Sequence, residues 1–350
     1  MKNTINISFF VVSLIILFSS LIPPDYFWMA GFLAYGIPVI LFANLALAIW
    51  KVYKKRRSAL YPLVILVLGY GFIRDTFRIH SSDSSGDLKV ITHNTRVFNV
   101  YFNNGKDTSS VRKMIDWINN EEADVVCFQE FYNDPGSSNF NTLKKIRDYN
   151  TYYYFHSPKV VNKIGAEFGD IIFSKYPIVK KGEISFGKNT MNKVIYADIK
   201  VKSDTIRIYN MHLQSMHIRE DELINADDLQ TGFRHLVSNL KNGFMQRAGQ
   251  IRILKEELKS CPHPVILCGD LNDLPYSYAY RQLNHELNNG FTKAGSGFGF
   301  TFNGKLFFLR IDNQFFSDEL KIHSYKTHRD MKSSDHFPVS ATYSIQKLSD

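Results

Sequence analysis

Two long runs of uncharged, apolar residues near the start of the chain constrain its fold more than any other feature. Residues 5–22 and 26–50 are each long enough to cross the hydrocarbon core of a bilayer as a helix. A third run, 59–73, is shorter and contains Pro62, but it can still span if Arg74 extends to the interface. The sequence therefore predicts two to three transmembrane helices.

The orientation of these helices follows from the basic segment KVYKKRR at 51–57. The densest positive cluster is expected on the cytoplasmic side, so with three spans everything after Ile73 lies outside. A cleaved signal peptide is the alternative for the first run, but its apolar core is long and no small-residue cleavage site follows. We expect an integral membrane protein, of the bacterial inner or plasma membrane type, with an extracytoplasmic catalytic domain.

Most of the net charge of +9 belongs to this N-terminal segment. Residues 1–80 hold eight Lys or Arg side chains and two Asp side chains, which leaves only +3 for the other 270 residues. A dedicated nucleic-acid-binding domain has a stronger basic excess. The three cysteines suggest neither a disulfide framework nor a zinc ligand set.

The sequence changes character at the polar segment 80–87 (HSSDSSGD), which we interpret as a linker between an anchor at 1–79 and a catalytic domain at 88–350. In this domain, helical patterns at 111–122 and 243–259 lie among short apolar runs of strand length. The runs are LKVIT, ADVVCF, DIIFS, VIYADI, TIRIYNM, PVILC, IDNQFF and VSATYS. This alternation predicts mixed β-sheets covered by helices.

Polar side chains end several of these runs. They are Asn94, Glu130, His212 and Asp270, with Asn272 two positions later. If the strands are neighbours, these groups gather at one edge of a sheet, where such folds commonly place a site. Any one of them alone is more commonly a turn former or a helix cap. Together with Ser334-Asp335-His336 near the C-terminus, they predict an active site.

Three of these side chains offer hard oxygen ligands. Asn94, Glu130 and Asp335 suit a Mg²⁺ or Mn²⁺ ion that also meets the phosphate oxygens of a substrate.

The remaining polar groups suit acid–base work beside such a metal. Asp270 and Asn272 could align an attacking water and a phosphoryl oxygen, while His336 and His212 could move protons or stabilise charge. Asp312, in RID, could orient an imidazole.

Six motifs in this order resemble the endonuclease/exonuclease/phosphatase superfamily, which includes pancreatic-type deoxyribonucleases, abasic-site endonucleases, neutral sphingomyelinases and inositol-polyphosphate phosphatases. The motifs are LKVITHNTRVFN, DVVCFQE, YNMHLQS, CGDLND, RIDNQFF and SSDHFPV, over residues 88–345. The resemblance implies an α/β fold, a four-layer α/β sandwich in which two mixed β-sheets pack face to face and are flanked by helices.

The resemblance also implies roles for matching residues. Glu130 resembles the metal-ligating glutamate, with Asn94 and Asp335 contributing to the metal region. Asp270 resembles the aspartate that orients or deprotonates the nucleophilic water, and Asn272 resembles the amide that contacts the scissile phosphate.

Two histidines and their neighbours complete the set. His336 resembles the histidine beside the phosphate, with Asp312 as its partner acid. His212 matches a histidine of the deoxyribonuclease and sphingomyelinase branches, which abasic-site endonucleases lack. Arg96 resembles a phosphate-contacting arginine, although an exposed solubilising arginine is an equal alternative. Glu167 is expected to support His212.

We therefore expect a membrane-anchored, metal-dependent phosphoester hydrolase that contacts the lipid bilayer, and no protein partner can be inferred. The substrate is lipid-borne, a small molecule or nucleic acid. The charge balance and the anchor favour the first two, whereas His212 and Arg96 favour a nuclease acting on DNA or RNA. A catalytically inactive, membrane-tethered binding module is the alternative of a different class. The stretch between His212 and the helix at 243 is interpreted as a lid, a bilayer-facing surface or a solvated helix.

Overall fold

The computed structural model describes residues 2–81, 86–101, 108–187, 190, 192–216 and 229–346. Contacts divide the chain into two compact units. The first comprises Met1–Phe77, Gln214–Arg252 and Asp273–Leu283, and the second comprises Arg78–Leu213, Ile253–Asn272 and Asn284–Asp350. Part of the expected linker, residues 82–85, lies outside the described residues.

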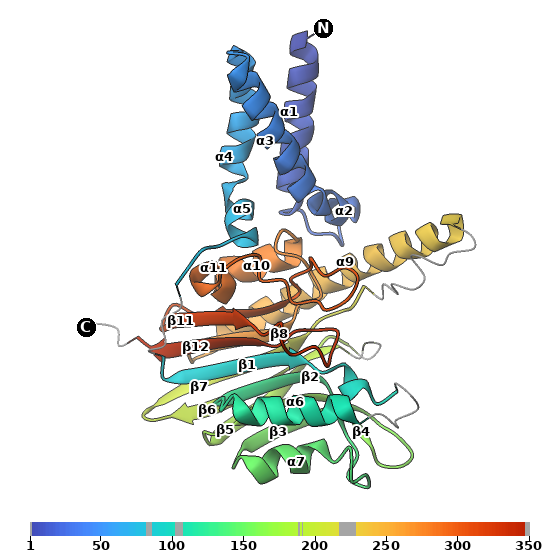
Figure 1. Cartoon of the computed structure of the whole chain (residues 1–350), viewed down its shortest axis with the longest axis vertical. Coiled ribbons are helices and arrows are strands. Elements are labelled where there is room, and N and C mark those ends of the chain that lie inside the picture. Colours follow the sequence, from blue (N-terminus) through green and yellow to red (C-terminus); the bar gives the residue numbers. More distant parts are fainter. Residues whose placement is uncertain are drawn as a thin grey trace. The chain divides into compact units, whose positions relative to one another are not determined.

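The apolar N-terminal runs form helices, of which those in the second and third runs break at glycines (Figure 1). They are α1 (Lys2–Ser19), α2 (Met29–Tyr35), α3 (Ile37–Tyr53), the 3₁₀ turn η1 (Arg57–Ala59), α4 (Leu60–Leu68) and α5 (Tyr70–Thr76). The breaks fall at Gly36 and Gly69. Beyond Gly36, Pro38 lacks the N–H that a continuous helix requires, so the second run bends there.

None of the described helices is by itself long and apolar enough to cross a membrane. Two bent pairs meet the requirement when their halves are taken together: Met29–Tyr35 with Ile37–Tyr53, bent by 45°, and Arg57–Leu68 with Tyr70–Thr76, bent by 50°. These pairs correspond to the runs at 26–50 and 59–73, and the run at 5–22 is a shorter apolar helix. Membrane crossing stays a prediction.

Two six-stranded sheets form the centre of the second unit (Figure 1). The first has the order β11-β12-β1-β2-β4-β3 and the second β5-β6-β7-β8-β10-β9. Because β1 is parallel to β2, and β7 to β8, in otherwise antiparallel sheets, both sheets are mixed as expected.

The strands of the first sheet are β1 (Leu88–Asn94), β2 (Val125–Asn133), β3 (Tyr153–Val161), β4 (Glu167–Ser174), β11 (Leu320–Thr327) and β12 (Val339–Ile345). Those of the second are β5 (Ile178–Ser185), β6 (Lys193–Val201), β7 (Asp204–His212), β8 (Val265–Asp270), β9 (Asn288–Asn289) and β10 (Asp312–Phe316). The helical elements described after β1 are η2 (Arg96–Asn99), α6 (Ser109–Asn120), α7 (Thr142–Tyr149), α9 (Leu229–Ser260), α10 (Tyr278–Glu286) and α11 (Gly290–Ala294).

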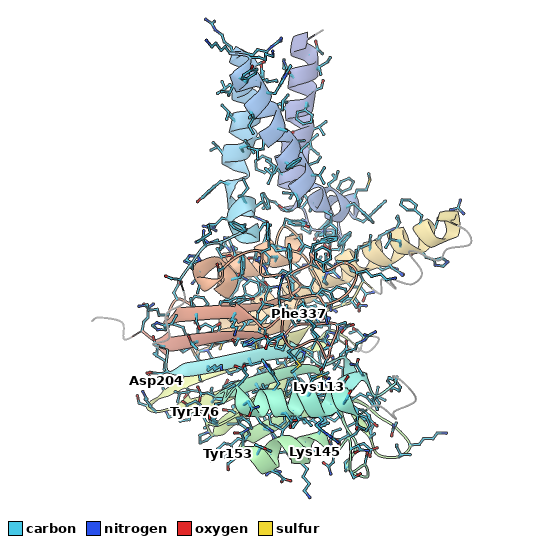
Figure 2. The ribbon with its side chains drawn as sticks, viewed as in Figure 1. Lys113, Lys145, Tyr153, Tyr176, Asp204 and Phe337 are labelled. Atoms are coloured by element: carbon cyan, nitrogen blue, oxygen red, sulfur yellow. The ribbon has the colours of Figure 1, made fainter. Side chains whose placement is uncertain are left out.

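Alternating side chains of the strands fill two apolar layers. Val90 and Cys127 face the second sheet and pack with Ile208. Because successive side chains point to opposite faces, Ile91 and Val126 lie instead with the helix residues of α6 and α7. Lys113 is exposed on the outer side of α6 (Figure 2). The expected α/β sandwich, two mixed sheets flanked by helices, is therefore confirmed.

Buried amides join the two sheets. Gln129 in the middle of β2 donates to Asn210 Oδ1 of β7 at 2.6 Å, and Asn210 Nδ2 donates to the carbonyls of Phe128 and Ile171 at 2.9 and 3.0 Å. These bonds satisfy polar groups that are otherwise costly to bury, and they fix how the two sheets face each other.

Candidate active site

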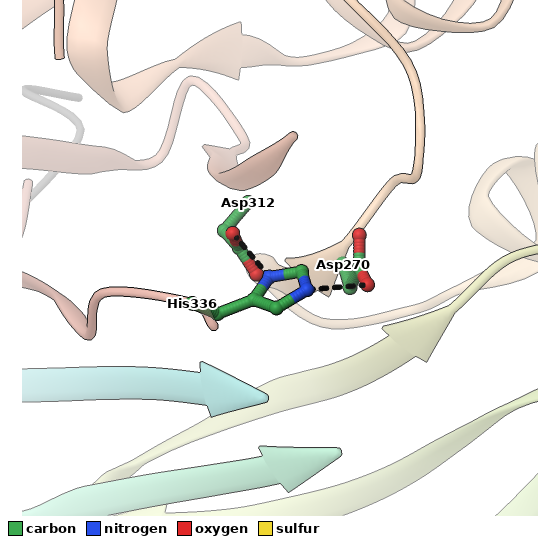
Figure 3. A group of neighbouring side chains, drawn as sticks. All are labelled: Asp270, Asp312 and His336. Carbon is green, nitrogen blue, oxygen red and sulfur yellow. Dashed lines mark hydrogen bonds and ion pairs between the residues drawn. The ribbon is translucent and has the colours of Figure 1, made fainter. Parts of the chain in front are cut away.

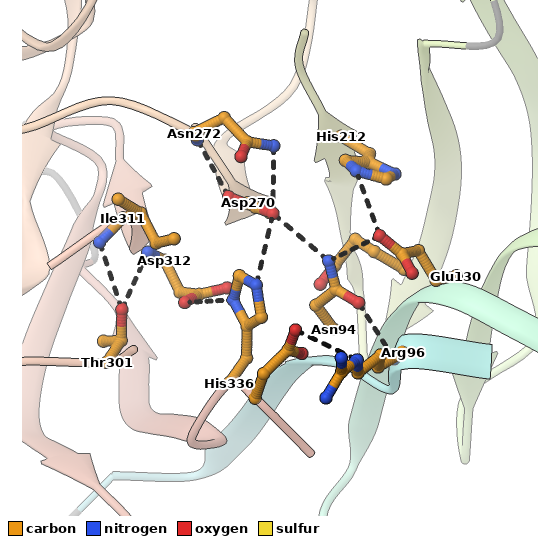
Figure 4. A network of polar contacts seen from close by, with 12 residues as sticks. Asn94, Arg96, Glu130, His212, Asp270, Asn272, Thr301, Ile311, Asp312 and His336 are labelled. Atoms are coloured by element: carbon orange, nitrogen blue, oxygen red, sulfur yellow. Dashed lines mark hydrogen bonds and ion pairs between the residues drawn. The ribbon is translucent and has the colours of Figure 1, made fainter. Parts of the chain in front are cut away.

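The polar residues that end the strands lie close together in one network of contacts (Figure 4). Asn94 ends β1, while His212 and Asp270 end the neighbouring strands β7 and β8, where they are partners in register. They come from two facing sheets, rather than from one sheet edge as expected. The Asn94 Nδ2 group donates to Asp270 Oδ2 at 3.2 Å and so joins the two halves of the site.

Glu130 reaches the site through an irregularity in β2. Its backbone φ is +51°, and the pairing of β2 with β4 shifts in register between Phe128 and Phe131. A left-handed φ is costly for a residue other than glycine and is commonly retained where it aims a functional side chain. The carboxylate remains 38% exposed.

Two nitrogen groups fix the orientation of Glu130. Asn94 Nδ2 donates to Glu130 Oε1 at 3.2 Å, and His212 Nε2 lies 3.7 Å from the same oxygen. The amide oxygen of Asn94 accepts from the backbone N–H of Arg96 at 3.0 Å. Asn94 therefore presents its nitrogen to two carboxylates and orients them, and its expected contribution to a metal site stays a prediction.

Asp335 is the second open carboxylate of the site. Its side chain is 27% exposed, and its Oδ2 lies 3.2 Å from Nε of Arg96, which itself is 44% exposed. Ser334 holds this segment, because its hydroxyl donates to the carbonyl of Asn94 at 2.8 Å and accepts from the N–H of His336. Half-exposed carboxylate oxygens at Glu130 and Asp335 fit a hard divalent cation such as Mg²⁺ or Mn²⁺.

Asp312, His336 and Asp270 form a buried relay (Figure 3). His336 Nδ1 lies 2.9 Å from Asp312 Oδ2, and His336 Nε2 lies 3.9 Å from Asp270 Oδ2. Ligand atoms of the three side chains lie within 4.8 Å of one another, close enough to share an ion. The imidazole nevertheless stands between the carboxylates and is hydrogen-bonded to one, which is the geometry of a proton relay.

Burial and charge act on this relay in opposite directions. Burial lowers the pKa of His336, but the carboxylates of Asp312 and Asp270 outweigh it and raise the pKa well above its usual value. Burial raises the pKa of Asp270, and the opposing effect of His336 does not cancel it. A carboxyl with a raised pKa is a stronger base than an ordinary aspartate.

A tight turn after β8 holds Asp270. The backbone N–H of Asn272, whose φ is +54°, donates to Asp270 Oδ1 at 2.8 Å, and its Nδ2 donates to Asp270 Oδ2 and to the carbonyl of Leu213, both at 3.0 Å. Gly269 precedes the turn with a φ of +130°, and a Cβ there would lie 2.1 Å from the Met211 carbonyl oxygen. Asn272 thus orients Asp270, and its expected contact with the substrate phosphate stays a prediction.

Asp170, rather than Glu167, is the carboxylate beside His212. Asp170 Oδ1 lies 3.8 Å from His212 Nδ1, and Asp170 Oδ2 lies 2.8 Å from Lys159 Nζ. Glu167 instead lies 3.3 Å from His156 Nδ1. Burial raises the pKa of Asp170, but Lys159 and His212 outweigh it, so the pKa falls to about 2.

Lys159 also lies beside His212. Its Nζ is 3.1 Å from His212 Nδ1, whereas His212 Nε2 faces Glu130. Lys159 could not be assigned to the site from the sequence, because it lies on an edge strand far from His212 along the chain.

Two further supporting residues were not identified from the sequence. Thr301 Oγ1 accepts hydrogen bonds from the backbone N–H groups of Ile311 and Asp312, each at 3.1 Å. His93 is buried, and its Nε2 lies 3.1 Å from the carbonyl oxygen of His336. Burial, with His336 nearby, lowers the pKa of His93 to about 3, so the neutral ring donates from Nε2.

Residues 93–336 match the family described as the Endonuclease/Exonuclease/phosphatase family, and residues 3–76 match a domain of unknown function. The first match covers more than half of the chain and includes every predicted site residue.

Solved structures with the same fold come from bacteria and from humans. A mannosyl-6-phosphatase of Bacteroides thetaiotaomicron is 18% identical, with 74% of this chain and 100% of that chain covered and a TM-score of 0.54. An endonuclease/exonuclease/phosphatase of Bacteroides vulgatus is 16% identical, with 74% of this chain and 99% of that chain covered and a TM-score of 0.55. The human Nocturnin catalytic domain is 18% identical, with 77% of this chain and 98% of that chain covered and a TM-score of 0.53. No curated protein matches the sequence significantly.

Proposed function

Because this chain belongs to the endonuclease/exonuclease/phosphatase family, we propose that it is a divalent-metal-dependent phosphoester hydrolase anchored in a membrane by its N-terminal helices. The observation that carries the proposal is the single polar network that joins the relay of Asp312, His336 and Asp270 to Glu130 through the Asn94 amide. Such a network places a base, a proton-handling imidazole and open oxygen ligands around one small volume.

Asp270 is the group we assign to the nucleophilic water. Two bonds from Asn272 and one from Asn94 fix its carboxylate, so a water that it orients meets the phosphorus from a defined direction. His336 faces Asp270 and takes or returns protons at Nε2, while Asp312 holds the opposite nitrogen. His212 presents its Nε2 to developing charge beside Glu130.

Glu130 and Asp335 are the residues that we expect to hold the metal. A bound divalent cation offsets the negative charge that phosphoryl transfer concentrates on the oxygens. Arg96 already lies against Asp335, so its guanidinium can contact the substrate phosphate that the metal would bind.

The packing of the N-terminal helices supports a membrane anchor. Val39, Phe42 and Val67 are 72%, 74% and 76% exposed, whereas Ser13 and Asn44 are buried and bonded to each other at 3.0 Å. Apolar side chains outside and polar ones inside form the pattern of helices that face lipid. With the basic segment 51–57 inside, the catalytic residues lie on the extracytoplasmic side.

The substrate that fits best is a small or lipid-borne phosphoester. The segment after residue 80 has a net charge of only +3, which offers few contacts for a long phosphate backbone. Cleavage of DNA or RNA is therefore expected to be weak and to fall steeply with salt.

A substrate panel tests the proposal on the full-length protein in detergent. It comprises a small phosphomonoester, a phosphodiester lipid in vesicles, and single-stranded DNA and RNA, each with Mg²⁺ and with Asp270→Asn as the background control. We expect faster turnover of one of the first two. Nanomolar, sequence-independent DNA binding at physiological salt would make nuclease the better proposal, and no hydrolysis of any substrate would favour an inactive binding module.

A further inference from the structure

The chain leaves the active site at two points, after β7 and after β8. Gln214 follows His212 by two residues, and Asp273 directly follows Asn272. Arg247 of α9 bonds to both: its Nη1 donates to the Gln214 carbonyl at 2.7 Å, and its Nε donates to Asp273 Oδ2 at 2.9 Å. Because the Arg247 side chain is fully buried, this bridge excludes water and has a fixed geometry.

The N-terminal helices supply the next partner of Asp273. The hydroxyl of Tyr35, the last residue of α2, donates to Asp273 Oδ1 at 2.9 Å, and the backbone N–H of Leu274 donates to the same oxygen. Each oxygen of this buried carboxylate is therefore bonded. A buried charge that loses one such partner is strongly destabilised, so the three side chains hold one another in place.

The contact around Tyr35 is closely packed. Tyr35 stacks edge-on against Phe244 of α9, with ring centroids 5.0 Å apart, and against Tyr276 at 6.0 Å. A Cβ at Gly31, one turn earlier in α2, would lie 2.5 Å from the Phe244 ring. Only glycine allows this approach, so α2 is fitted to α9.

We infer that Arg247, Asp273 and Tyr35 are positioning residues of the active site, and that the N-terminal segment supports catalysis in addition to its proposed role as an anchor. The activity part of this inference rests on the proposed hydrolase function. The turn at Asp270–Asn272 transmits a change at Asp273 to Asp270, because Asn272 has a left-handed backbone and gives Asp270 two of its hydrogen bonds. Such a conformation persists only where the surrounding structure holds it. A loosened Asp273 lets the turn relax and frees Asp270.

The test compares Tyr35→Phe with Tyr70→Phe in the full-length protein. Both changes remove one hydroxyl from an N-terminal helix, but Tyr70 is 62% exposed. For Tyr35→Phe we expect kcat to fall about tenfold, since small displacements of a catalytic group cost up to about 10²-fold in rate. KM stays within about twofold, and hydrogen exchange of the amides at 270–276 becomes faster. Tyr70→Phe leaves all three unchanged.

Arg247→Lys gives a second, independent measurement. Lysine keeps the charge but cannot donate from two fixed positions to Gln214 and Asp273, so kcat should fall further than in Tyr35→Phe. A lower melting temperature with unchanged kcat and unchanged exchange at 270–276 in both variants would overturn the inference, since the contacts would then be merely structural.

Hydrogen exchange separates this inference from the proposed function. If the wild type hydrolyses no phosphoester, and exchange at 270–276 still accelerates only in Tyr35→Phe and Arg247→Lys, the hydrolase proposal fails and the support of the turn stands. If the wild type is active and the Tyr35 and Tyr70 variants behave alike in kcat and exchange, the inference fails and the hydrolase stands.

Discussion

At the scale of single residues, the carboxylates around His336 differ in exposure from those proposed to hold the metal. The side chains of Asp270 and Asp312 are 2% and 1% exposed, whereas those of Asp335 and Glu130 are 27% and 38% exposed. Buried carboxylates need internal partners and find one in His336, while open carboxylates can exchange water for an ion. Exposure thus separates the carboxylates that we propose for proton handling from those that we propose for metal binding.

The relay makes a quantitative prediction. Removing a positioned general acid or base costs about 10²–10⁴ in rate, so His336→Ala should lower kcat by that much with little change in KM. Asp312→Asn should do less harm because the imidazole remains. His285→Ala, with a side chain 81% exposed, is the matched control. Steady-state kinetics on the best phosphoester measures both constants, and a loss of less than a few-fold in His336→Ala would place the site elsewhere.

Asp170 gives a pH-dependent prediction. Its pKa is about 2 in the folded protein against 3.8 ordinarily, so its contribution of about 2 kcal/mol is complete above about pH 4 and disappears as the pH falls towards 2. The gap in melting temperature between wild type and Asp170→Asn should therefore narrow over this range. A gap that stays constant from pH 5 to pH 2 would contradict the assigned pairing with Lys159 and His212.

The sequence contains enough information to prefer Asp170 to Glu167 as the carboxylate beside His212. Positions three apart in a strand point to opposite faces. Asp170 shares its face with Ile172, which packs towards the second sheet, whereas Glu167 shares its face with Ile171 and Phe173, which pack under the helices. Strand alternation alone therefore places Asp170 on the side of His212. The role of Lys159 required the register of β3, which the sequence does not provide.

At the scale of elements, all eight runs expected as strands are strands, and the strands that were not predicted lie at sheet edges. They are β3, β5, β9 and β11. An edge strand is covered on fewer sides, so it needs no continuous apolar run, and β3 and β5 are largely exposed. The helix expected at 243–259 in fact begins at Leu229. Its early turns were not predicted, because they carry more polar residues. Buried elements were thus predictable, whereas peripheral ones were not.

The segment that holds β10 provides a prediction about stability. Thr301→Val removes the hydroxyl oxygen that accepts hydrogen bonds from the N–H groups of Ile311 and Asp312. Each buried donor left unpaired costs about 1–3 kcal/mol. Thr327→Val on β11 is the control, since within the described residues the buried Thr327 hydroxyl has no hydrogen-bond partner. Urea unfolding should show a clear loss for Thr301→Val only, and equal stability of the two variants would refute the assigned bonds.

At the scale of the whole molecule, the proposed topology places residues 51–57 in the cytoplasm and the linker outside. Single cysteines at Ser58 and Ser84, in a background with Cys261→Ser because Cys261 is only partly buried, test it with an impermeant thiol reagent on intact cells. Ser84 lies outside the described residues, so labelling is the direct observation there. We expect labelling at Ser84 and none at Ser58. Labelling at Ser58 alone would reverse the orientation and move the catalytic residues to the cytoplasm.

The most direct test of the central claim is the metal dependence of hydrolysis by the full-length protein. Turnover of the best phosphoester is measured against Mg²⁺ concentration and in excess EDTA, for wild type, Glu130→Gln and Glu122→Gln. Glu122 is an exposed glutamate with the same φ of +51°, which makes it a matched control for the backbone. We predict that EDTA abolishes wild-type activity, that Mg²⁺ restores it, and that only Glu130→Gln loses both turnover and the Mg²⁺ response. Full wild-type activity in excess EDTA would contradict a metal-dependent site at Glu130.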